Sequence, residues 1–175
     1  MTKPAEKPLK LEPMTADDES AIAAQLGREP RGVAGIAWRC PCGHPGVVAT
    51  EPRLPQGTPF PTTYYLTCRN AVARTSTLEA NGVMADMTER LAQDEELAQD
   101  YRAAHESYLA DRARLGDVPE IEGISAGGMP TRVKCLHVLV GHALAKGPGV
   151  NPLGDEALER LGEFWQNCCV EDTQD

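Results

Sequence analysis

The fold of this chain is decided by residues 33–68, which read VAGIAWRCPCGHPGVVATEPRLPQGTPFPTTYYLTC. β-Branched and aromatic residues recur in three short runs, which predicts strands at residues 33–39, 46–51 and 62–67. The segments that link these runs are rich in Pro and Gly, the residues that form turns and shaped loops. The stretch therefore predicts a small antiparallel sheet of about three strands in the N-terminal half of the chain.

Apolar residues outside this stretch follow helical spacing. Thr15 and Asp18 are spaced as a capping box, with Asp in place of the usual Glu or Gln, and Gly27 ends the helix that they open. Further helical segments are predicted from residue 69 to the Asn81-Gly82 turn, around residues 84–91, and at residues 94–115, 130–146 and 155–167. A sheet followed by helices is an α+β arrangement, in which we expect four to five helices to pack with the sheet.

The 175 residues suit one domain with tails. Residues 1–14 are charged and Pro-rich, so we expect a disordered N-terminal lead there. We expect residues 15–167 to form a single α+β domain and residues 168–175 to form a loose acidic tail.

The charge balance excludes some classes of partner. Lys and Arg number 17 against 26 Asp and Glu, which gives a net charge of −9. A general nucleic-acid binder needs a surplus of cations for its phosphate contacts, and so does a protein that binds anionic membranes. The sequence has no apolar run of the about 20 residues that a membrane helix needs, and its N-terminus lacks an apolar signal core. We therefore expect a cytoplasmic protein, in which six cysteines are thiols or metal ligands more often than disulfides.

A turn that carries Cys and His lies between the first two predicted strands, at Cys40-Pro-Cys42-Gly-His44. Thiolate and imidazole are good donors to soft and borderline metals such as Zn²⁺. The C-x-C spacing differs from the usual C-x-x-C knuckle, and no second matching pair follows in the sequence. Metal ligation and an ordinary Pro/Gly turn with an exposed His both remain open for this loop.

Cys68 ends the third predicted strand and opens the next helix. Free backbone N–H groups and the helix dipole stabilise a thiolate at such a position, and Arg69 adds positive charge nearby. Cys68 is therefore a candidate reactive or ligating thiol, with a plain N-cap residue as the alternative. Cys168 and Cys169 lie near the tail, where we expect surface or helix-end thiols that are prone to oxidation.

The apolar segment 130–146 carries Cys135, His137 and His142. In a continuous helix, Cys135 and His142 share a face because they are seven residues apart, and His137 points away from Cys135. This helix can offer one Cys and one His to a buried site, with His137 at its edge. The alternative is a buried Cys that packs as a small apolar residue beside a hydrogen-bonded core His.

Three phrases are specific to a known family: GTPFPT at residues 57–62, YLTC at 65–68 and VKCLH at 133–137. With them the chain resembles the bacterial domain-of-unknown-function family 501, an uncharacterised and mostly actinobacterial family, over roughly residues 27–154. The resemblance implies a site without naming a reaction. It also implies protein partners, because such proteins are encoded in many actinobacteria beside a septum-formation protein and a polyphosphate-type phosphatase.

Residues of this chain divide into those that fit the family and those that depart from it. The positions that match the family's pattern are Cys40, Cys68, Cys135 and His137, and His142 matches a common histidine. Cys42 and His44 stand where the family has an aromatic and an apolar residue. The resemblance therefore lowers Cys42 and His44 as ligands.

These observations leave three hypotheses for function. The first is a metal centre, zinc or iron–sulfur, in which Cys40, Cys68 and Cys135 converge and a His or Cys42 is the fourth ligand. Its role would be regulatory or scaffolding, linked to cell division or polyphosphate metabolism. The second is an enzyme with Cys68 or Cys135 as nucleophile and His137 or His142 as base. The third is a metal-free interaction module that uses the polar helix at residues 94–115 as its surface.

Overall fold

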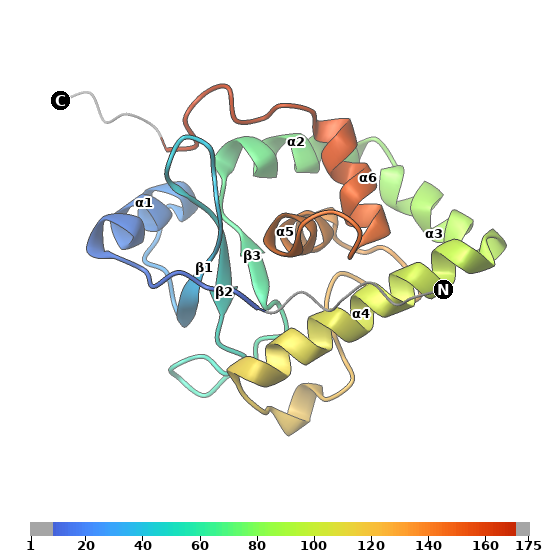
Figure 1. Cartoon of the computed structure of the whole chain (residues 1–175), viewed down its shortest axis with the longest axis horizontal. Coiled ribbons are helices and arrows are strands. Elements are labelled where there is room, and N and C mark those ends of the chain that lie inside the picture. The colour runs from blue at the N-terminus through green and yellow to red at the C-terminus, as the bar shows by residue number, and fades with distance from the viewer. Residues whose placement is uncertain (1–8, 171–175) are drawn as a thin grey trace.

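The computed structural model describes residues 9–170 and shows a three-stranded antiparallel sheet in the N-terminal half, followed mostly by helices (Figure 1). The strand order is β1-β2-β3, and the strands are β1 (Val33–Arg39), β2 (Pro45–Thr50) and β3 (Tyr64–Leu66). The α-helices are α1 (Ala16–Leu26), α2 (Arg69–Ala80), α3 (Val83–Gln93), α4 (Glu95–Leu115), α5 (Leu136–Lys146) and α6 (Pro152–Leu161), and a short 3-10 helix spans Pro119–Ile121. The predicted α+β fold and its three strands are confirmed. The described residues contain six α-helices, slightly more than the predicted four to five.

Strand β2 is buried along its whole length because helices cover both faces of the sheet. On one face, Ile36 and Val48 pack with Ile22 of α1. On the other face, Val47 and Ala49 belong to the main core, to which α5 contributes most of its residues. Figure 1 shows α1 on one side of the sheet and α5 on the other. Consecutive residues of β2 therefore serve opposite cores, as the two-residue period of a strand dictates.

The segment before α1 is paired with the sheet. Glu12 and Ile36 exchange backbone hydrogen bonds of 2.9 and 2.8 Å beside β1. A Cβ atom on Gly35 would lie 2.9 Å from the Glu12 carbonyl oxygen, so glycine is what permits this close approach. The predicted disordered lead is therefore wrong for residues 9–14, and residues 1–8 lie outside the described part of the chain.

Helix α5 begins later than the predicted 130–146. The Gly127 carbonyl accepts hydrogen bonds from the backbone N–H groups of Lys134 (2.7 Å) and Cys135 (3.4 Å), which folds the segment before α5 into a turn. Gly127 has φ of 70°, a conformation that suits glycine. Cys135 therefore lies at the N-cap of α5 in an extended conformation, with φ −151° and ψ 110°.

The last helix is also displaced from its predicted range of 155–167. The Asn151 side-chain oxygen accepts from the Gly154 backbone N–H at 2.9 Å, which caps the helix so that Pro152 is its first residue. Gly162, with φ of 65°, lies at its C-cap. Residues 163–170 follow as an irregular segment.

A buried charge pair joins helices α4 and α5 to the sheet. The Lys146 ammonium lies 2.9 Å from a carboxylate oxygen of Asp111, and both side chains are almost fully buried. The Tyr64 hydroxyl donates to the same carboxylate at 2.6 Å. Because Asp111 accepts from both groups, its buried charge is paired and hydrogen-bonded, as burial of a carboxylate requires.

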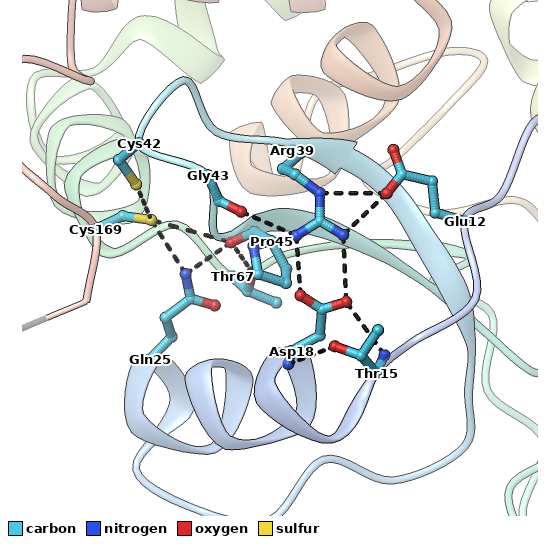
Figure 2. Close-up of polar contacts among 10 residues, drawn as sticks. All are labelled: Glu12, Thr15, Asp18, Gln25, Arg39, Cys42, Gly43, Pro45, Thr67 and Cys169. Atoms are coloured by element: carbon cyan, nitrogen blue, oxygen red, sulfur yellow. Dashed lines mark hydrogen bonds and ion pairs between the residues drawn. The ribbon is translucent and has the colours of Figure 1, made fainter.

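The predicted capping box is present, and its Asp18 carboxylate also forms an ion pair with Arg39. Thr15 and Asp18 exchange side-chain-to-backbone hydrogen bonds of 3.2 and 3.1 Å at the start of α1. The Asp18 carboxylate also binds the Arg39 guanidinium at the end of β1, with N–O distances of 2.9 and 3.2 Å (Figure 2). Arg39 in turn contacts the Glu12 carboxylate and the Gly43 carbonyl, each at 2.9 Å. One guanidinium thus joins the first segment, α1 and the loop after β1.

Asp18→Asn tests this junction through its pH dependence. The hydrogen bond from Arg39 lowers the pKa of the Asp18 carboxyl from 3.8 to about 2, so the ionised form stabilises the fold above about pH 4 and this stabilisation is lost as the pH falls through about 2. We expect the variant to lose about 2 kcal/mol of unfolding free energy at neutral pH and to show a flatter decline in acid. Urea denaturation at a series of pH values measures both effects. Asp17→Asn, which changes an exposed neighbour, should keep the wild-type curve, and an unchanged acid decline in Asp18→Asn would contradict the assignment.

Candidate metal centre

Cysteines from three separate segments meet at one end of the sheet, and the loop between β1 and β2 supplies two of them. The Gly43 N–H donates to the Cys40 carbonyl at 2.8 Å, and the Cys40 N–H donates to the His44 carbonyl at 2.9 Å. Gly43 has φ of 94°, so the turn depends on glycine there. The loop is therefore a closed turn that carries Cys40 and Cys42 side by side.

Cys68 reaches the same end of the sheet through Gly46. The Gly46 carbonyl accepts from two consecutive backbone N–H groups, those of Thr67 (2.8 Å) and Cys68 (3.1 Å), which extends the β2–β3 pairing past the end of β3. A Cβ atom on residue 46 would overlap the Trp38 ring, so the position needs glycine. Cys68 is fully buried and is the N-cap residue of α2.

Cys169 comes back to this end from the C-terminal segment. Phe164 packs against Trp38 of β1, with ring centroids 6.0 Å apart. The Asn70 side chain of α2 donates to the Asn167 carbonyl at 2.9 Å. These two contacts hold the segment that places Cys169 in the core, where it is 1% exposed.

Figure 2 shows the Cys169 sulfur between Cys42 and the Gln25 amide of α1. Its Sγ lies 3.5 Å from the Cys42 Sγ and accepts from Gln25 Nε2 at 3.2 Å. Gln25 Nε2 also donates to the Pro45 carbonyl at 2.7 Å. The amide thus fixes the sulfur relative to the start of β2.

The sulfurs of Cys40, Cys68 and Cys169 form a compact group in which every pair lies within 4.8 Å. Cys42 adds a fourth sulfur through its 3.5 Å contact with Cys169. Zinc–sulfur bonds of about 2.3 Å in a tetrahedron place the sulfurs about 3.8 Å apart. Three of the thiols therefore have the spacing of zinc ligands, and Cys42 supplies a fourth sulfur next to one of them.

The environment divides the four thiols into two kinds. Burial raises the pKa of Cys40 to about 11. Burial also opposes the charge on Cys42, but backbone N–H groups of Cys169 and His44 overcome it and lower the pKa of Cys42 to about 6. A hydrogen bond with Cys169, together with N–H groups at the start of α2, lowers the pKa of Cys68 to about 7, and the same bond raises the pKa of Cys169. Without a cation, like charges in this volume disfavour ionisation of all four thiols together.

Cys135 and His137 lie in a second group, apart from this one. The Cys135 Sγ, a ring nitrogen of His137 and a carboxylate oxygen of Glu79 all lie within 4.8 Å of one another. The single site expected at Cys40, Cys68 and Cys135 is therefore divided in two. Within the second group, burial opposes the thiolate of Cys135, but a hydrogen bond with His137 and the Val138 N–H together outweigh it and lower the pKa of Cys135. That bond and the Glu79 charge raise the pKa of His137.

The expectation that His137 points away from Cys135 is wrong. The Cys135 Sγ lies 4.0 Å from His137 Nδ1. The expectation assumed that both residues lie in one helix, whereas Cys135 is extended and only His137 is helical. The turn at Gly127 is what brings the two side chains together.

His142 belongs to neither group and lies in the core. Its ring stacks on Tyr64 and meets Tyr108 edge-on, with centroids 5.7 and 5.1 Å away. His142 Nδ1 lies 3.2 Å from the Asn151 amide nitrogen, and burial lowers the pKa of the imidazole to about 3. This arrangement is the hydrogen-bonded core histidine that the sequence left open as the alternative.

Cys169 is the residue of the site that sequence reasoning missed, because the tail prediction placed it in a loose segment. Cys168 is exposed as expected, but Cys169 beside it is buried. Phe164, an apolar residue just before the acidic end, is buried against Trp38, whereas Trp165 beside it is exposed. Cys42 joins the site despite its departure from the family pattern, whereas His44 contributes its backbone. Residues 171–175 of the predicted tail lie outside the described part.

Comparison with known proteins gives a family and no annotated relative. A family model described as "Protein of unknown function (DUF501)" matches residues 36–159. This segment contains Cys40, Cys42 and Cys68 together with the Cys135 group, and it ends before Cys169. No curated protein and no solved structure matches the chain. None of the helices within residues 9–170 combines the length and the hydropathy that a membrane span requires.

Cys42 should be alkylated at a half-maximal rate near pH 6 in reduced, chelator-treated protein, because backbone N–H groups stabilise its thiolate and its side chain is only partly buried. Iodoacetamide labelling with peptide mass mapping at a series of pH values measures this rate. Cys40 is the internal comparison, because its burial and raised pKa should make it slow throughout. A Cys42 rate that still rises above about pH 8.5, as for an ordinary thiol, would contradict the prediction.

Proposed function

The chain belongs to the DUF501 family, and we propose that it is a metal-stabilised scaffold in which Cys40, Cys42, Cys68 and Cys169 bind one structural Zn²⁺ ion. The observation that carries the proposal is the meeting of three buried sulfurs, all within 4.8 Å of one another, from three parts of the chain that are far apart in sequence. Cysteines from the loop, the end of the sheet and the C-terminal segment have no shared local reason to meet. A common ligand supplies that reason.

The donors around these sulfurs support ligation over simple apolar packing. The Cys42 N–H faces the Cys40 sulfur, and N–H groups of Asn70 and Ala71 face the Cys68 sulfur. Gln25 adds a side-chain N–H to Cys169 at 3.2 Å. Such donors stabilise thiolates and orient metal ligands, whereas a thiol that packs as an apolar residue needs none of them.

The spacing favours zinc over an iron–sulfur cluster. An iron–sulfur cluster places several irons and sulfides among its thiolates and so needs the cysteine sulfurs farther apart. Sulfurs within 4.8 Å of one another surround the volume of one ion. Four thiolates around a single ion are the usual ligand set of structural zinc.

Burial supports a structural role for the ion rather than a catalytic one. The side chains of Cys40, Cys68 and Cys169 are at most 2% exposed, so they leave no approach for a substrate. The same burial weighs against Cys68 as the nucleophile of an enzyme, since a nucleophile must reach its substrate. An ion in a closed site that joins the C-terminal segment to the sheet fits the scaffolding or regulatory role expected from the sequence. Septum-formation proteins and polyphosphate-type phosphatases are the first partners to test.

Cys169→Ser tests the proposal against a matched neighbour, Cys168→Ser. We expect Cys169→Ser to lose one equivalent of Zn²⁺ per chain and to lower Tm by about 10 °C, because metal binding contributes directly to folding. We expect Cys168→Ser, which changes an exposed thiol, to keep both values. Elemental analysis and calorimetry of the full chain measure them.

Equal zinc content in the two variants would overturn the proposal, as would wild-type protein with less than about a tenth of an equivalent after growth with zinc. Visible absorption with stoichiometric iron and sulfide would replace zinc by an iron–sulfur cluster.

A further inference from the structure

Helices α2 and α5 bring together a second set of ligand-type side chains. This set comes from two helices only, whereas the four thiols come from three separate segments. Glu79 lies in the last turn of α2, Cys135 is the N-cap of α5, and His137 lies in the first turn of α5. His137 Nδ1 lies 3.2 Å from a Glu79 carboxylate oxygen and 4.0 Å from the Cys135 sulfur. A thiol, an imidazole and a carboxylate therefore face one point.

The Glu79 carboxylate is held in place by the backbone of α5. One of its oxygens, Oε2, accepts from the Leu136 N–H at 2.9 Å, which satisfies a free donor at the start of the helix. The other oxygen, Oε1, is the one that faces His137 Nδ1. The carboxylate thus caps the helix with one oxygen, and its second oxygen remains directed at His137.

The tautomer of His137 is fixed by its other ring nitrogen. His137 Nε2 lies 3.3 Å from the Val72 carbonyl, which can only accept, so Nε2 carries a hydrogen. The Ser76 hydroxyl, 3.1 Å from Nε2, is a second acceptor there. In the neutral imidazole, Nδ1 then presents a lone pair to the Glu79 carboxylate and the Cys135 sulfur. Metal-binding histidines are held in this way, with the far N–H donated to a backbone carbonyl.

Three electron-rich atoms that face one another need a positive charge between them. A proton on Nδ1 supplies it for the carboxylate, which lies closer to Nδ1 than the sulfur does, 3.2 against 4.0 Å. With both ring nitrogens protonated, the imidazole cannot act as a general base. A divalent ion, by contrast, uses all three atoms at once.

We propose that Glu79, Cys135 and His137 form a second metal site, separate from the four thiols, which binds Zn²⁺ or a similar transition ion through three protein ligands. Cys135 and His137 also line a cleft of about 550 Å³ beside β3, whose walls include Tyr65 and Val138. The three ligand residues are partly exposed, unlike the four-thiol site. The ion therefore has a coordination position that faces the cleft and holds water, as in zinc sites that keep three protein ligands.

Titration of the full chain with Zn²⁺ and Co²⁺ tests this site. We expect two equivalents of Zn²⁺ in the wild type. Glu79→Gln, which keeps an oxygen to accept from Leu136, should weaken the second equivalent at least ten-fold, and Cys135→Ser should remove it. Thr77→Ala changes an exposed neighbour on α2 and should leave both equivalents intact. With Co²⁺, Cys135→Ser should remove the thiolate-to-cobalt absorption of the second equivalent only.

The variants separate this site from the four-thiol site. If one equivalent binds, is lost in Cys169→Ser and is kept in Cys135→Ser, the second site is overturned and the four-thiol site stands. If one equivalent is lost in Cys135→Ser and kept in Cys169→Ser, the second site stands and the four-thiol proposal fails. Two equivalents that both survive Cys135→Ser and Glu79→Gln, in variants whose helical circular dichroism matches the wild type, would also overturn the second site.

Discussion

The carbonyl oxygen of Gly46 accepts hydrogen bonds from the backbone of both Thr67 and Cys68, and much of the molecule depends on this shared acceptor. It continues the pairing of β2 with β3 beyond the last strand residue and so sets Cys68 opposite the Cys40 loop. The absence of a side chain at Gly46 leaves room for the Trp38 ring. Phe164 packs against that ring, and it precedes the segment that carries Cys169. One backbone position therefore governs the approach of all three segments.

Two helices begin at cysteines, and the difference between them explains the two groups of ligand-type side chains. Cys68, at the start of α2, is enclosed by the sheet, the loop and the C-terminal segment, so its neighbours are other thiols. Cys135, at the start of α5, borders a cleft, and its neighbours are a carboxylate and an imidazole. Because Glu79 lies at the far end of the helix that Cys68 opens, α2 connects the two groups directly. The Asp111–Lys146 pair fixes the opposite end of α5.

Local patterns in the sequence were sufficient for the strands, the capping box at Thr15 and the candidacy of Cys40 and Cys68, because each depends on neighbours a few residues away. The grouping of the cysteines was not predictable in this way. Cys135 has other partners than the helical pattern predicts, because the turn closed by Gly127 delays the start of α5 and turns the thiol toward His137. Cys169 was missed because its burial depends on the contact of Phe164 with Trp38, which no local pattern encodes.

The position of Cys169 in the chain also sets an order of events during synthesis. Cys40, Cys42 and Cys68 leave the ribosome first, and about a hundred residues follow before Cys169 is added, on the order of ten seconds at usual elongation rates. For that interval Trp38 has no Phe164 to pack against. Cys169 is also missing, both as the acceptor for the Gln25 amide and as the fourth thiol. The nascent chain thus holds three of the four thiols until Cys169 is added, and the group is complete only after that residue is translated.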